Sequence, residues 1–292
     1  MINHVVDQAQ KLRELAAALK KTTQRIITVT SGKGGVGKSN VVINLAIAIS
    51  RMGKRVLIID ADLGLANVDI LLGLKNKFNL QHVIEGRMKL KDIVVYGPAG
   101  VKVVPGSSGI PRIANMSSRK RQEFITSFKE LEGEADVILI DTSAGMTKNV
   151  INLALLADEI VLVTTPEPSA ITDAYAMIKV IHAEKPLARL GLVVNMARTE
   201  AEALEVANKI AHVARQFLNF HVFILGMLPN DPCVPKAVMQ RQPWSELYPR
   251  AAATKAIKQV AAKLLNGGVH SASNGNGFIQ RLSAYFKPDG QT

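Results

Sequence analysis

Residues 32–39 read GKGGVGKS, and they constrain the fold more than any other part of the chain. They follow a β-branched run at residues 26–30 and precede a helical pattern rich in Val, Ile, Leu and Ala, which is the strand–loop–helix setting of a phosphate-binding loop. The glycines allow successive backbone N–H groups to turn towards phosphate oxygens, and the following helix adds its positive end. The loop therefore predicts an α/β fold that binds a nucleoside triphosphate.

The loop also assigns roles to individual residues. In this pattern Lys38 bridges the β- and γ-phosphates, and the Ser39 hydroxyl ligates Mg²⁺. The residues expected to contact the nucleotide are Gly32, Lys33, Gly34, Gly35, Val36, Gly37, Lys38, Ser39 and Asn40. The expected cofactors are ATP and Mg²⁺.

From residue 26 onwards, short β-branched runs alternate with helical patterns, which is typical of a parallel sheet with crossover helices. The predicted strands are 26–30, 55–60, 101–104, 137–141, 159–164, 191–195 and 222–225. The predicted helices are 38–51, 117–131, 148–157, 169–183, 200–218 and 244–265. Several strands are nearly continuous in Val, Ile and Leu, as strands covered on both faces should be. The pattern predicts a doubly wound, mainly parallel α/β domain over residues 25–266.

Composition narrows the class of protein. The net charge is +12, with 36 Lys and Arg against 24 Asp and Glu, so the surface favours an anionic partner such as a nucleotide, phospholipid headgroups or nucleic acid. The single cysteine, Cys233, excludes an internal disulfide and any Cys-x-x-Cys site, which agrees with a reducing compartment. No run reaches the ~18 apolar residues of a membrane span, and the N-terminus lacks a signal-peptide pattern. We expect a cytosolic protein.

Two strand ends supply the carboxylates that Mg²⁺ requires. Asp141 ends the run VILID and suits a metal-holding role. The earlier run VLIID ends at Asp60, which is a second expected metal ligand, and Asp62 follows it in position to orient the attacking water. For each aspartate the alternative is a helix cap or turn acid. Their placement at the carboxyl ends of parallel strands favours a functional role.

The sequence identifies the residues that contact the nucleotide base less clearly than those that contact the phosphates. The chain has no Asn-Lys-x-Asp motif that would select guanine. The candidate adenine contacts are Asn195, at the end of a predicted strand, and Pro229 with Asp231 in a later loop. Each of the three is also compatible with an ordinary loop position.

Residues 1–24 predict one helix, with Val5, Ala9, Leu12, Ala16 and Leu19 on a single stripe. This stripe fits either the chain's own domain or a groove on a partner. Residues 267–277 have the glycine-rich composition of a flexible tether.

The last segment, 278–288, predicts a short amphipathic helix with basic edges. Its apolar arc contains Phe278, Ile279, Leu282, Tyr285 and Phe286. Such a helix can lie in a membrane interface or pack into a groove of the core. We expect it to dock in the monomer and to be released in the ATP-bound dimer.

The loop and the strand ends together resemble a known family. Lys33 within KGGVGKS, Asp60-Ala61-Asp62 and residues 141–145 (DTSAG) are similar to the deviant Walker A ATPases of the MinD and ParA group, over residues 26–265. The resemblance implies a SIMIBI-type P-loop NTPase fold and slow ATP hydrolysis with Lys33, Lys38 and Asp62 as catalytic residues. It also implies an ATP-dependent homodimer in which Lys33 reaches the nucleotide of the second subunit. Ser39 stands where much of the family has Thr, and Ser143 where many members have Pro or Gly.

Within this family, the sequence most resembles the flagellar-number regulators FlhG and FleN. The similar segments are 37–40 (GKSN), 62–69 (DLGLANVD) and 7–13 (DQAQKLR). The resemblance implies that the N-terminal helix stimulates the flagellar GTPase FlhF, which resembles the signal-recognition particle, through Asp7, Gln8, Leu12 and Arg13. It further allows flagellar switch (C-ring) proteins and a flagellar transcription activator as partners, with reversible binding to the inner face of the cytoplasmic membrane.

Three other functions fit parts of the sequence. A DNA-partitioning ATPase of the ParA kind would use the +12 charge, although DNA has no need of a tethered apolar helix and nucleic acid is not expected as a partner. A MinD-like division-site regulator would lack the N-terminal helix. A scaffold that binds nucleotide without hydrolysis could still dimerise. Metal-cluster carriers of the same superfamily are excluded by the lack of paired cysteines.

Overall fold

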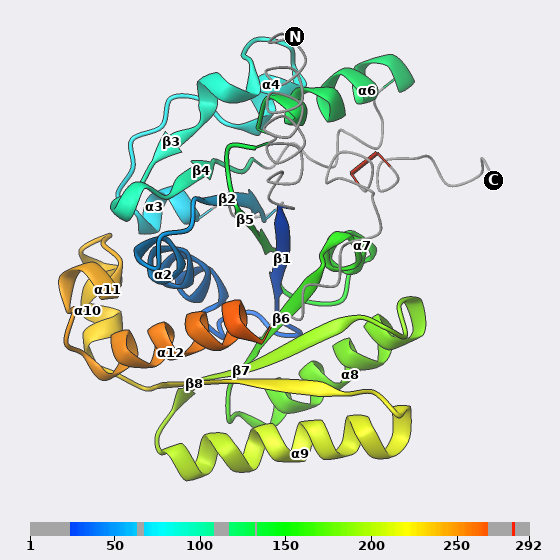
Figure 1. The fold of residues 1–292 in the computed structure, drawn as a ribbon, viewed down its shortest axis with the longest axis vertical. Coiled ribbons are helices and arrows are strands. Elements are labelled where there is room, and N and C mark those ends of the chain that lie inside the picture. Colours follow the sequence, from blue (N-terminus) through cyan, green and yellow to red (C-terminus); the bar gives the residue numbers. More distant parts are fainter. Residues whose placement is uncertain (1–23, 63–66, 108–116, 132, 268–281, 284–292) are drawn as a thin grey trace, which may run out of the picture.

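The computed structural model describes residues 24–62, 67–107, 117–131, 133–267 and 282–283. Within them one eight-stranded sheet has the order β3-β4-β2-β5-β1-β6-β7-β8 (Figure 1). Its strands are β1 Arg25–Thr30, β2 Val56–Ala61, β3 Val95–Tyr96, β4 Lys102–Val104, β5 Val137–Thr142, β6 Glu159–Thr164, β7 Arg189–Ala197 and β8 Val222–Pro229. All neighbouring strands are parallel except the edge pair β3 and β4. The predicted fold class is confirmed.

Helices cover both faces of the sheet (Figure 1). On one face lie α2 Lys38–Arg51, α10 Cys233–Met239, α11 Trp244–Leu247 and α12 Ala252–Asn266; on the other lie α7 Lys148–Leu156, α8 Pro168–Glu184 and α9 Glu200–Leu218. The shorter helices α3 Val68–Leu71, α4 Leu80–Ile84 and α6 Ser118–Ser127 follow β2 and β4, and 3₁₀ turns occupy Leu90–Ile93, Pro98–Gly100 and Phe128–Leu131. Two apolar layers result, one on each side of the sheet.

The alternation of side chains along each strand builds these two layers. Ile26 packs into the layer beneath α7, α8 and α9, whereas the next residue, Ile27, packs into the layer beneath α2 and α12. Leu57 and Ile58 divide in the same way on β2. Successive side chains of a strand point to opposite faces, so a strand covered on both faces must be apolar throughout. This requirement explains the continuous Val, Ile and Leu runs in the sequence.

Several predicted elements need correction. The predicted helix 244–265 was wrong, because the chain forms α11 and α12 with a break at Tyr248 and Pro249. Proline lacks a backbone N–H and cannot continue a helical hydrogen-bond ladder. The prediction also missed β3, α3, α4 and α10, which are all short, and ended β8 four residues too early. These differences lie outside the central strands.

The terminal predictions fall largely outside the described residues. This holds for the helix at residues 1–23, for the tether from 268 and for the amphipathic segment except Leu282 and Ser283. Leu282 is 5% exposed and belongs to the apolar layer that also contains residues of α7 and α8. The division into 1–24, 25–266, 267–277 and 278–288 stays a prediction. In the described part of the chain, no helix is both long and apolar enough to span a membrane.

Candidate functional site

The parallel strands bring the predicted site residues to one edge of the sheet. The loop after β1, Asp60 at the end of β2 and Asp141 at the end of β5 all lie at the carboxyl ends of neighbouring strands, and Asp60 is in register with Asp141. Open α/β sheets bind their ligands at this edge. Asn195 near the end of β7 belongs to the same edge.

The backbone of the 32–39 loop depends on its glycines. Gly35 and Gly37 have φ values of 81° and 83°, a left-handed conformation that favours glycine. A Cβ on Gly37 would lie 2.5 Å from the Asn195 side-chain nitrogen, so the loop also needs a small residue there. Among the described residues, no side chain caps the N-terminus of α2, and its first turn carries no acid. The first N–H groups of the helix are thus available to an anion.

Lys38 and Asp141 form a buried ion pair inside this loop. The Lys38 ammonium donates to Asp141 Oδ1, with exposed side-chain fractions of 7% and 1%. The second oxygen of Asp141, Oδ2, is buried without a hydrogen-bond partner in the described structure. Burial raises the pKa of the Asp141 carboxyl, against the opposing effects of Lys38 and the Ser39 hydroxyl. A buried carboxylate oxygen that lacks a donor fits a magnesium ion or a metal-bound water.

The cradle as a whole fits Mg²⁺ with a nucleotide. Lys38 and the start of α2 would hold the phosphates, while Ser39 and Asp141 Oδ2 would hold the metal or its waters. The described residues contain no group of three or more His, Cys, Asp and Glu able to hold a metal unaided. Mg²⁺ commonly takes only one or two protein carboxylates together with substrate phosphates, so this donor set suits it.

Asp60 is occupied differently from Asp141. Its Oδ1 accepts the Asp62 N–H at 3.1 Å, and its Oδ2 accepts the N–H groups of Asn67 and Val68 at 3.1 and 3.2 Å. Burial first, and the nearby Asp141 second, raise the pKa of Asp60 to about 7. Asp60 therefore ties together the backbone on either side of residues 63–66. Its predicted role as a metal ligand stays a prediction.

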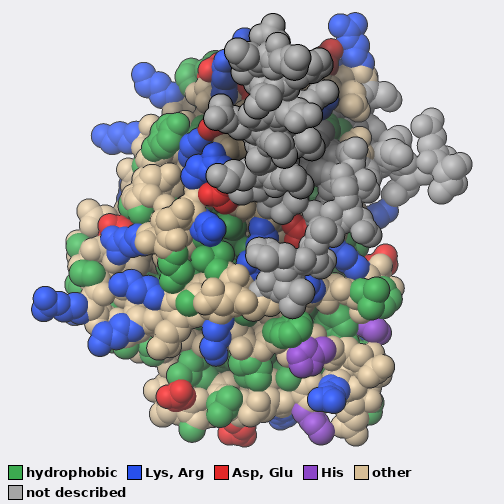
Figure 2. Space-filling model, in the orientation of Figure 1, with side chains coloured by type: hydrophobic (Ala, Val, Ile, Leu, Met, Phe, Trp, Pro, Cys, Tyr) green, Lys and Arg blue, Asp and Glu red, His purple; other side chains and the backbone are tan. Residues whose placement is uncertain are grey.

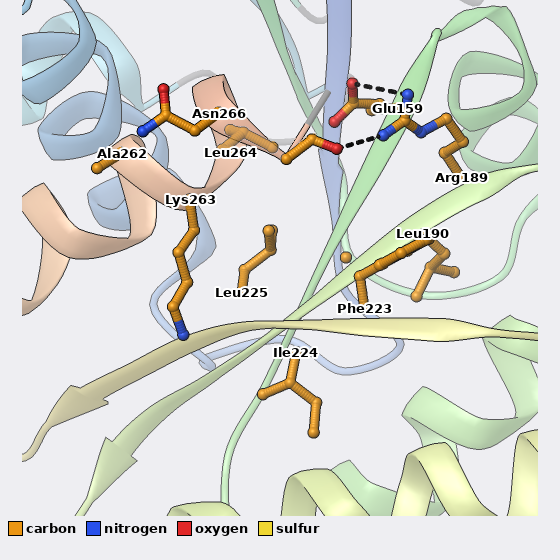
Figure 3. Close-up of a pocket in the computed structure, with 12 residues that line it drawn as sticks. Glu159, Arg189, Leu190, Phe223, Ile224, Leu225, Ala262, Lys263, Leu264 and Asn266 are labelled. Carbon is orange, nitrogen blue, oxygen red and sulfur yellow. Dashed lines mark hydrogen bonds and ion pairs between the residues drawn. The ribbon is translucent and has the colours of Figure 1, made fainter. Parts of the chain in front are cut away.

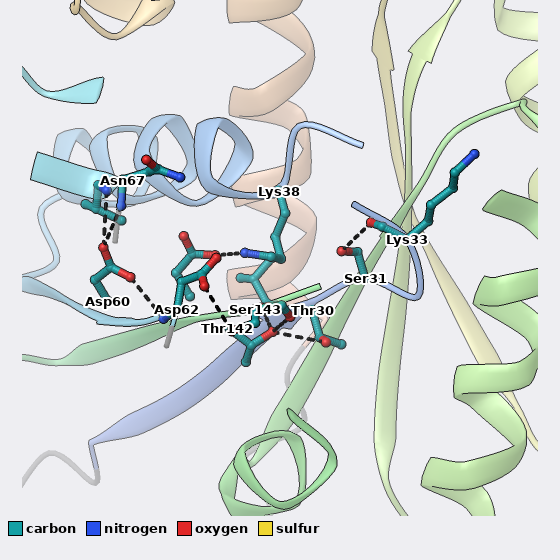
Figure 4. A network of polar contacts seen from close by, with 12 residues as sticks. Thr30, Ser31, Lys33, Lys38, Asp60, Asp62, Asn67, Thr142 and Ser143 are labelled. Carbon is teal, nitrogen blue, oxygen red and sulfur yellow. Dashed lines mark hydrogen bonds and ion pairs between the residues drawn. The ribbon is translucent and has the colours of Figure 1, made fainter. Parts of the chain in front are cut away.

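Asp62 contacts a residue that the sequence reasoning did not connect with it. The Ser143 hydroxyl donates to Asp62 Oδ1 at 3.0 Å, across 81 positions of sequence (Figure 4). The neighbouring Thr142 hydroxyl lies 3.2 Å from the Val29 carbonyl, and the Gly145 N–H donates to the Ser31 carbonyl at 2.9 Å. These bonds join the end of β5 and the segment after it to β1 and to Ser31, the residue directly before the phosphate loop.

Lys33 points away from this cluster (Figure 4). Its ammonium donates to the carboxylate of Glu167 and to the Ser169 hydroxyl at 2.7 Å, and Ser169 in turn donates to Glu167 at 2.8 Å. The Lys33 side chain is 34% exposed and that of Glu167 is 57% exposed. The hydrogen bond from Lys33 holds the pKa of the Glu167 carboxyl below its ordinary value. The two lysines of one loop thus face different surroundings.

Glu167 and Ser169 were missed by the sequence reasoning. They follow the end of β6 and begin α8, with Pro168 at the first helical position. Polar residues directly after a parallel strand were a usable signal, because the same signal marked Asp60 and Asp141. The distance of 134 positions between Lys33 and Glu167 concealed the pairing.

The three candidate base contacts lie together at the ends of β7 and β8, where Ala197 and Pro229 are in register. The Asn195 side-chain nitrogen donates to the Val36 carbonyl at 2.8 Å, so this residue supports the phosphate loop. Asp231 accepts the Cys233 N–H at 2.9 Å and the Ala253 N–H at 3.1 Å, which joins α10 to the start of α12. Contact with adenine stays a prediction for all three. Asn40 lies in the first turn of α2, where its carbonyl accepts from Asn44.

A cavity of about 480 Å³ lies at the opposite ends of the strands (Figure 3). It is lined by the starts of β6, β7 and β8 and by the last turn of α12, and Gly191 leaves room for Leu225. Arg189 lies between the Glu159 carboxylate and the Gly267 carbonyl, to which it donates at 2.8 Å. The cavity lies at the amino ends of the strands and the phosphate loop lies at their carboxyl ends, so the two are on opposite edges of the sheet.

Comparison with known proteins places these features in context. A family model named ParA, described as "NUBPL iron-transfer P-loop NTPase", matches residues 22–265. Antiactivator FleN of Pseudomonas aeruginosa is 40% identical over 260 residues, which cover 88% of this chain and 93% of the relative. Flagellum site-determining protein YlxH of Helicobacter pylori is 32% identical over 271 residues, covering 91% and 92%. These matches confirm the resemblance to the ParA and MinD group and to the flagellar regulators.

A solved structure agrees with the fold. Septum site-determining protein MinD of Pyrococcus horikoshii, complexed with Mg-ADP, matches with a TM-score of 0.68 and 30% identity, over 84% of this chain and 98% of that one. Iron transfer is named for the matching family, and this chain has one cysteine, Cys233.

Proposed function

The chain belongs to the ParA and MinD family of P-loop ATPases, and on this premise we propose that it is a switch driven by Mg·ATP that regulates the number or placement of bacterial flagella. It is an ATPase that uses Mg²⁺. The flagellar role rests on the similarity to FleN and YlxH, and the observation that carries the switch is the divergence of the two loop lysines. Lys38 is buried against Asp141, whereas Lys33 lies at the surface against Glu167.

The buried lysine performs the part of the cycle that one subunit can complete alone. Lys38 exchanges Asp141 for the β- and γ-phosphates, which places its charge where negative charge develops during phosphoryl transfer. Asp141 Oδ2 and the Ser39 hydroxyl would then hold the metal or its waters. When bound, Mg²⁺ neutralises phosphate charge and fixes the orientation of the triphosphate.

Asp62 orients the attacking water in this proposal. Its carboxylate is placed by the Ser143 hydroxyl at 3.0 Å. The Asp60 carboxylate holds the Asp62 N–H and thereby fixes the backbone at the same point. A water-orienting group must be held in position, because turnover falls when the attacking atom leaves its line of approach.

The exposed lysine couples ATP to dimerisation. Lys33 leaves Glu167 and Ser169 and reaches the nucleotide of a second subunit, so that two sites are completed together. Exposed ion pairs contribute little net stability. Lys33 can therefore change partners at small cost, whereas Lys38 leaves Asp141 only when phosphates replace that carboxylate.

The terminal segments give the switch its output in this proposal. The helix at residues 1–24 stimulates the flagellar GTPase FlhF, and the 278–288 helix attaches the dimer reversibly to the cytoplasmic membrane. Burial of Leu282 in the apolar layer supports a docked state of the second helix in the monomer. Release of this residue on dimerisation would couple ATP to membrane binding.

Turnover at increasing protein concentration tests the switch. ATP hydrolysis per subunit should rise with concentration, and a chain with Lys33→Ala should bind ATP and lose the rise. A rate per subunit that is independent of concentration would contradict the dimeric mechanism.

Stimulation of the purified GTPase tests the output. The full chain should raise its GTP turnover, and Leu12→Glu, on the predicted apolar stripe, should abolish the effect. Lys21→Glu lies off the stripe and should stimulate normally. Equal stimulation by both variants would remove the N-terminal helix from the proposal.

A further inference from the structure

The surface formed by α10, α11 and α12 is strongly basic. Residues 233–267 contain a single acidic residue, Glu246. They contain six exposed cations, which we call the α10–α12 face: Lys236, Arg241, Arg250, Lys255, Lys258 and Lys263. Lys and Arg side chains are visible over these helices in Figure 2. Much of the net charge of +12 is therefore concentrated on one side of the protein.

Glu246 is the one carboxylate that residues 233–267 place among these six cations. Glu246 is already bound by Arg51 at 2.7 Å, and no carboxylate in the described part of the chain forms an ion pair with any of the six. Some basic residues elsewhere have partners, as in the pair of Arg55 with Asp136 at 2.7 Å, and others, such as Lys179 and Lys209, form no ion pair within the described residues. The α10–α12 face differs in the number of unpaired cations that it brings together. Like charges on one surface repel unless an anion faces them. The face is therefore matched to an external anionic surface.

The three helices hold these charges in a fixed arrangement. Asp231 joins the start of α10 to the start of α12 through two backbone N–H groups. Asn44 of α2 accepts the N–H of Ser245 at 2.9 Å, which fixes α11. The Thr254 hydroxyl donates to the Tyr248 carbonyl at 2.8 Å across the break between α11 and α12. The charges are thus presented by ordered backbone.

We propose that the α10–α12 face binds the anionic phospholipid headgroups of a membrane. This deepens the proposed function, because it rests on membrane association and adds a second contact to it. Met239 is 85% exposed and lies between Lys236 and Arg241 in sequence. A bare apolar side chain among cations gains from entering a lipid interface, whereas the phosphates of DNA offer it nothing.

The position of α12 supports the same partner. This helix ends at Asn266, where the chain continues towards the amphipathic segment predicted at residues 278–288. A helix of that length binds a membrane only marginally, and stable attachment requires a second signal such as a basic surface. Each Lys or Arg near an anionic membrane contributes about 1 kcal/mol. The α10–α12 face can supply that signal.

The test compares two charge reversals in the full chain. The first combines Arg250→Glu, Lys255→Glu and Lys258→Glu; the matched control combines Lys179→Glu, Lys209→Glu and Arg215→Glu on α8 and α9. Both lower the net charge equally. The probes are vesicles of phosphatidylcholine with and without phosphatidylglycerol, in the presence of a non-hydrolysable ATP analogue. Thermal unfolding and ATP turnover confirm that both variants fold and work.

The unsubstituted chain (the parent) should sediment with the anionic vesicles and should dissociate from them in high salt. The first variant should bind them at least about tenfold more weakly, and the control should stay close to the parent. Equal binding by parent and first variant, equal loss in both variants, or no binding by the parent would each overturn the proposal. Retention on duplex DNA that the first variant alone loses, with vesicle binding unchanged, would assign the face to nucleic acid. ATP-dependent dimerisation, measured separately, shows whether the proposed switch itself has failed.

Discussion

Lys33 and Lys38 lie five residues apart in one loop, yet they occupy opposite environments. Lys38 is 7% exposed and paired with a carboxylate that is 1% exposed, whereas Lys33 is 34% exposed and paired with one that is 57% exposed. Removing one partner of a buried pair is costly, while an exposed pair exchanges partners easily. One lysine of the loop is therefore fixed beside the carboxylate at the nucleotide site, and the other remains free to contact a second molecule.

The largest effect should follow the loss of the buried lysine. Lys38→Ala leaves Asp141 uncompensated and should lower the free energy of unfolding by about 3–5 kcal/mol in urea titrations without nucleotide. It should also weaken ATP binding by at least about 100-fold in calorimetry, because two charge-assisted hydrogen bonds of about 1.5–3 kcal/mol each are lost. Lys33→Ala is the matched control and, at protein concentrations where the chain is monomeric, should change neither quantity much. Similar losses in both variants would remove the distinction.

Loss of the Asp62 carboxylate, which we propose orients the attacking water, should separate hydrolysis from assembly. Asp62→Ala should lower ATP turnover by about 100- to 10,000-fold. The variant should still dimerise on ATP, because it retains Lys33 and Lys38. Light scattering measures this assembly independently of turnover. Asp92→Ala, an exposed acid on the 3₁₀ turn Leu90–Ile93, provides the control. Normal turnover after Asp62→Ala would exclude this residue from the mechanism.

The free energy of unfolding should also depend on pH, because Asp60 is buried near Asp141. The pKa of Asp60 is raised to about 7 in the folded protein, above its ordinary value near 4, so the folded state binds the proton more tightly. Stability from this group is complete below about pH 4 and is lost as pH rises through about 7, by up to about 4 kcal/mol. Urea unfolding without nucleotide should show this decline, and Asp60→Asn should flatten it. A decline of the same size in the variant would assign the dependence elsewhere.

A smaller effect should follow when the exposed ion pair between Lys33 and Glu167 is weakened. Glu167→Gln weakens the hold on Lys33, so ATP-dependent dimers should form at a protein concentration that is lower by about two- to fivefold. Glu184→Gln, at the other end of α8, is the matched control. Dimerisation that becomes weaker after Glu167→Gln would show that Glu167 supports the dimer.

Much of this arrangement was predictable from local sequence. The phosphate loop, the central strands and the aspartates at their ends follow from glycine spacing and apolar runs, because these features act over a few residues. The contacts of Ser143 with Asp62 and of Lys33 with Glu167 join positions 81 and 134 apart, and no local pattern encodes such pairs. The break at Pro249 was visible, but the apolar periodicity on either side of it concealed the end of α11.

If Lys33 acts on the nucleotide of a second subunit, a mixture of two inactive variants should recover activity. Lys33→Ala retains Asp62, and Asp62→Ala retains Lys33. A mixed dimer therefore contains one site with its own Asp62 and a lysine from the partner. The mixture should hydrolyse ATP faster than the sum of the two variants measured separately. A rate equal to that sum, under conditions where mixed dimers are detected, would show that Lys33 does not complete the site of the second subunit.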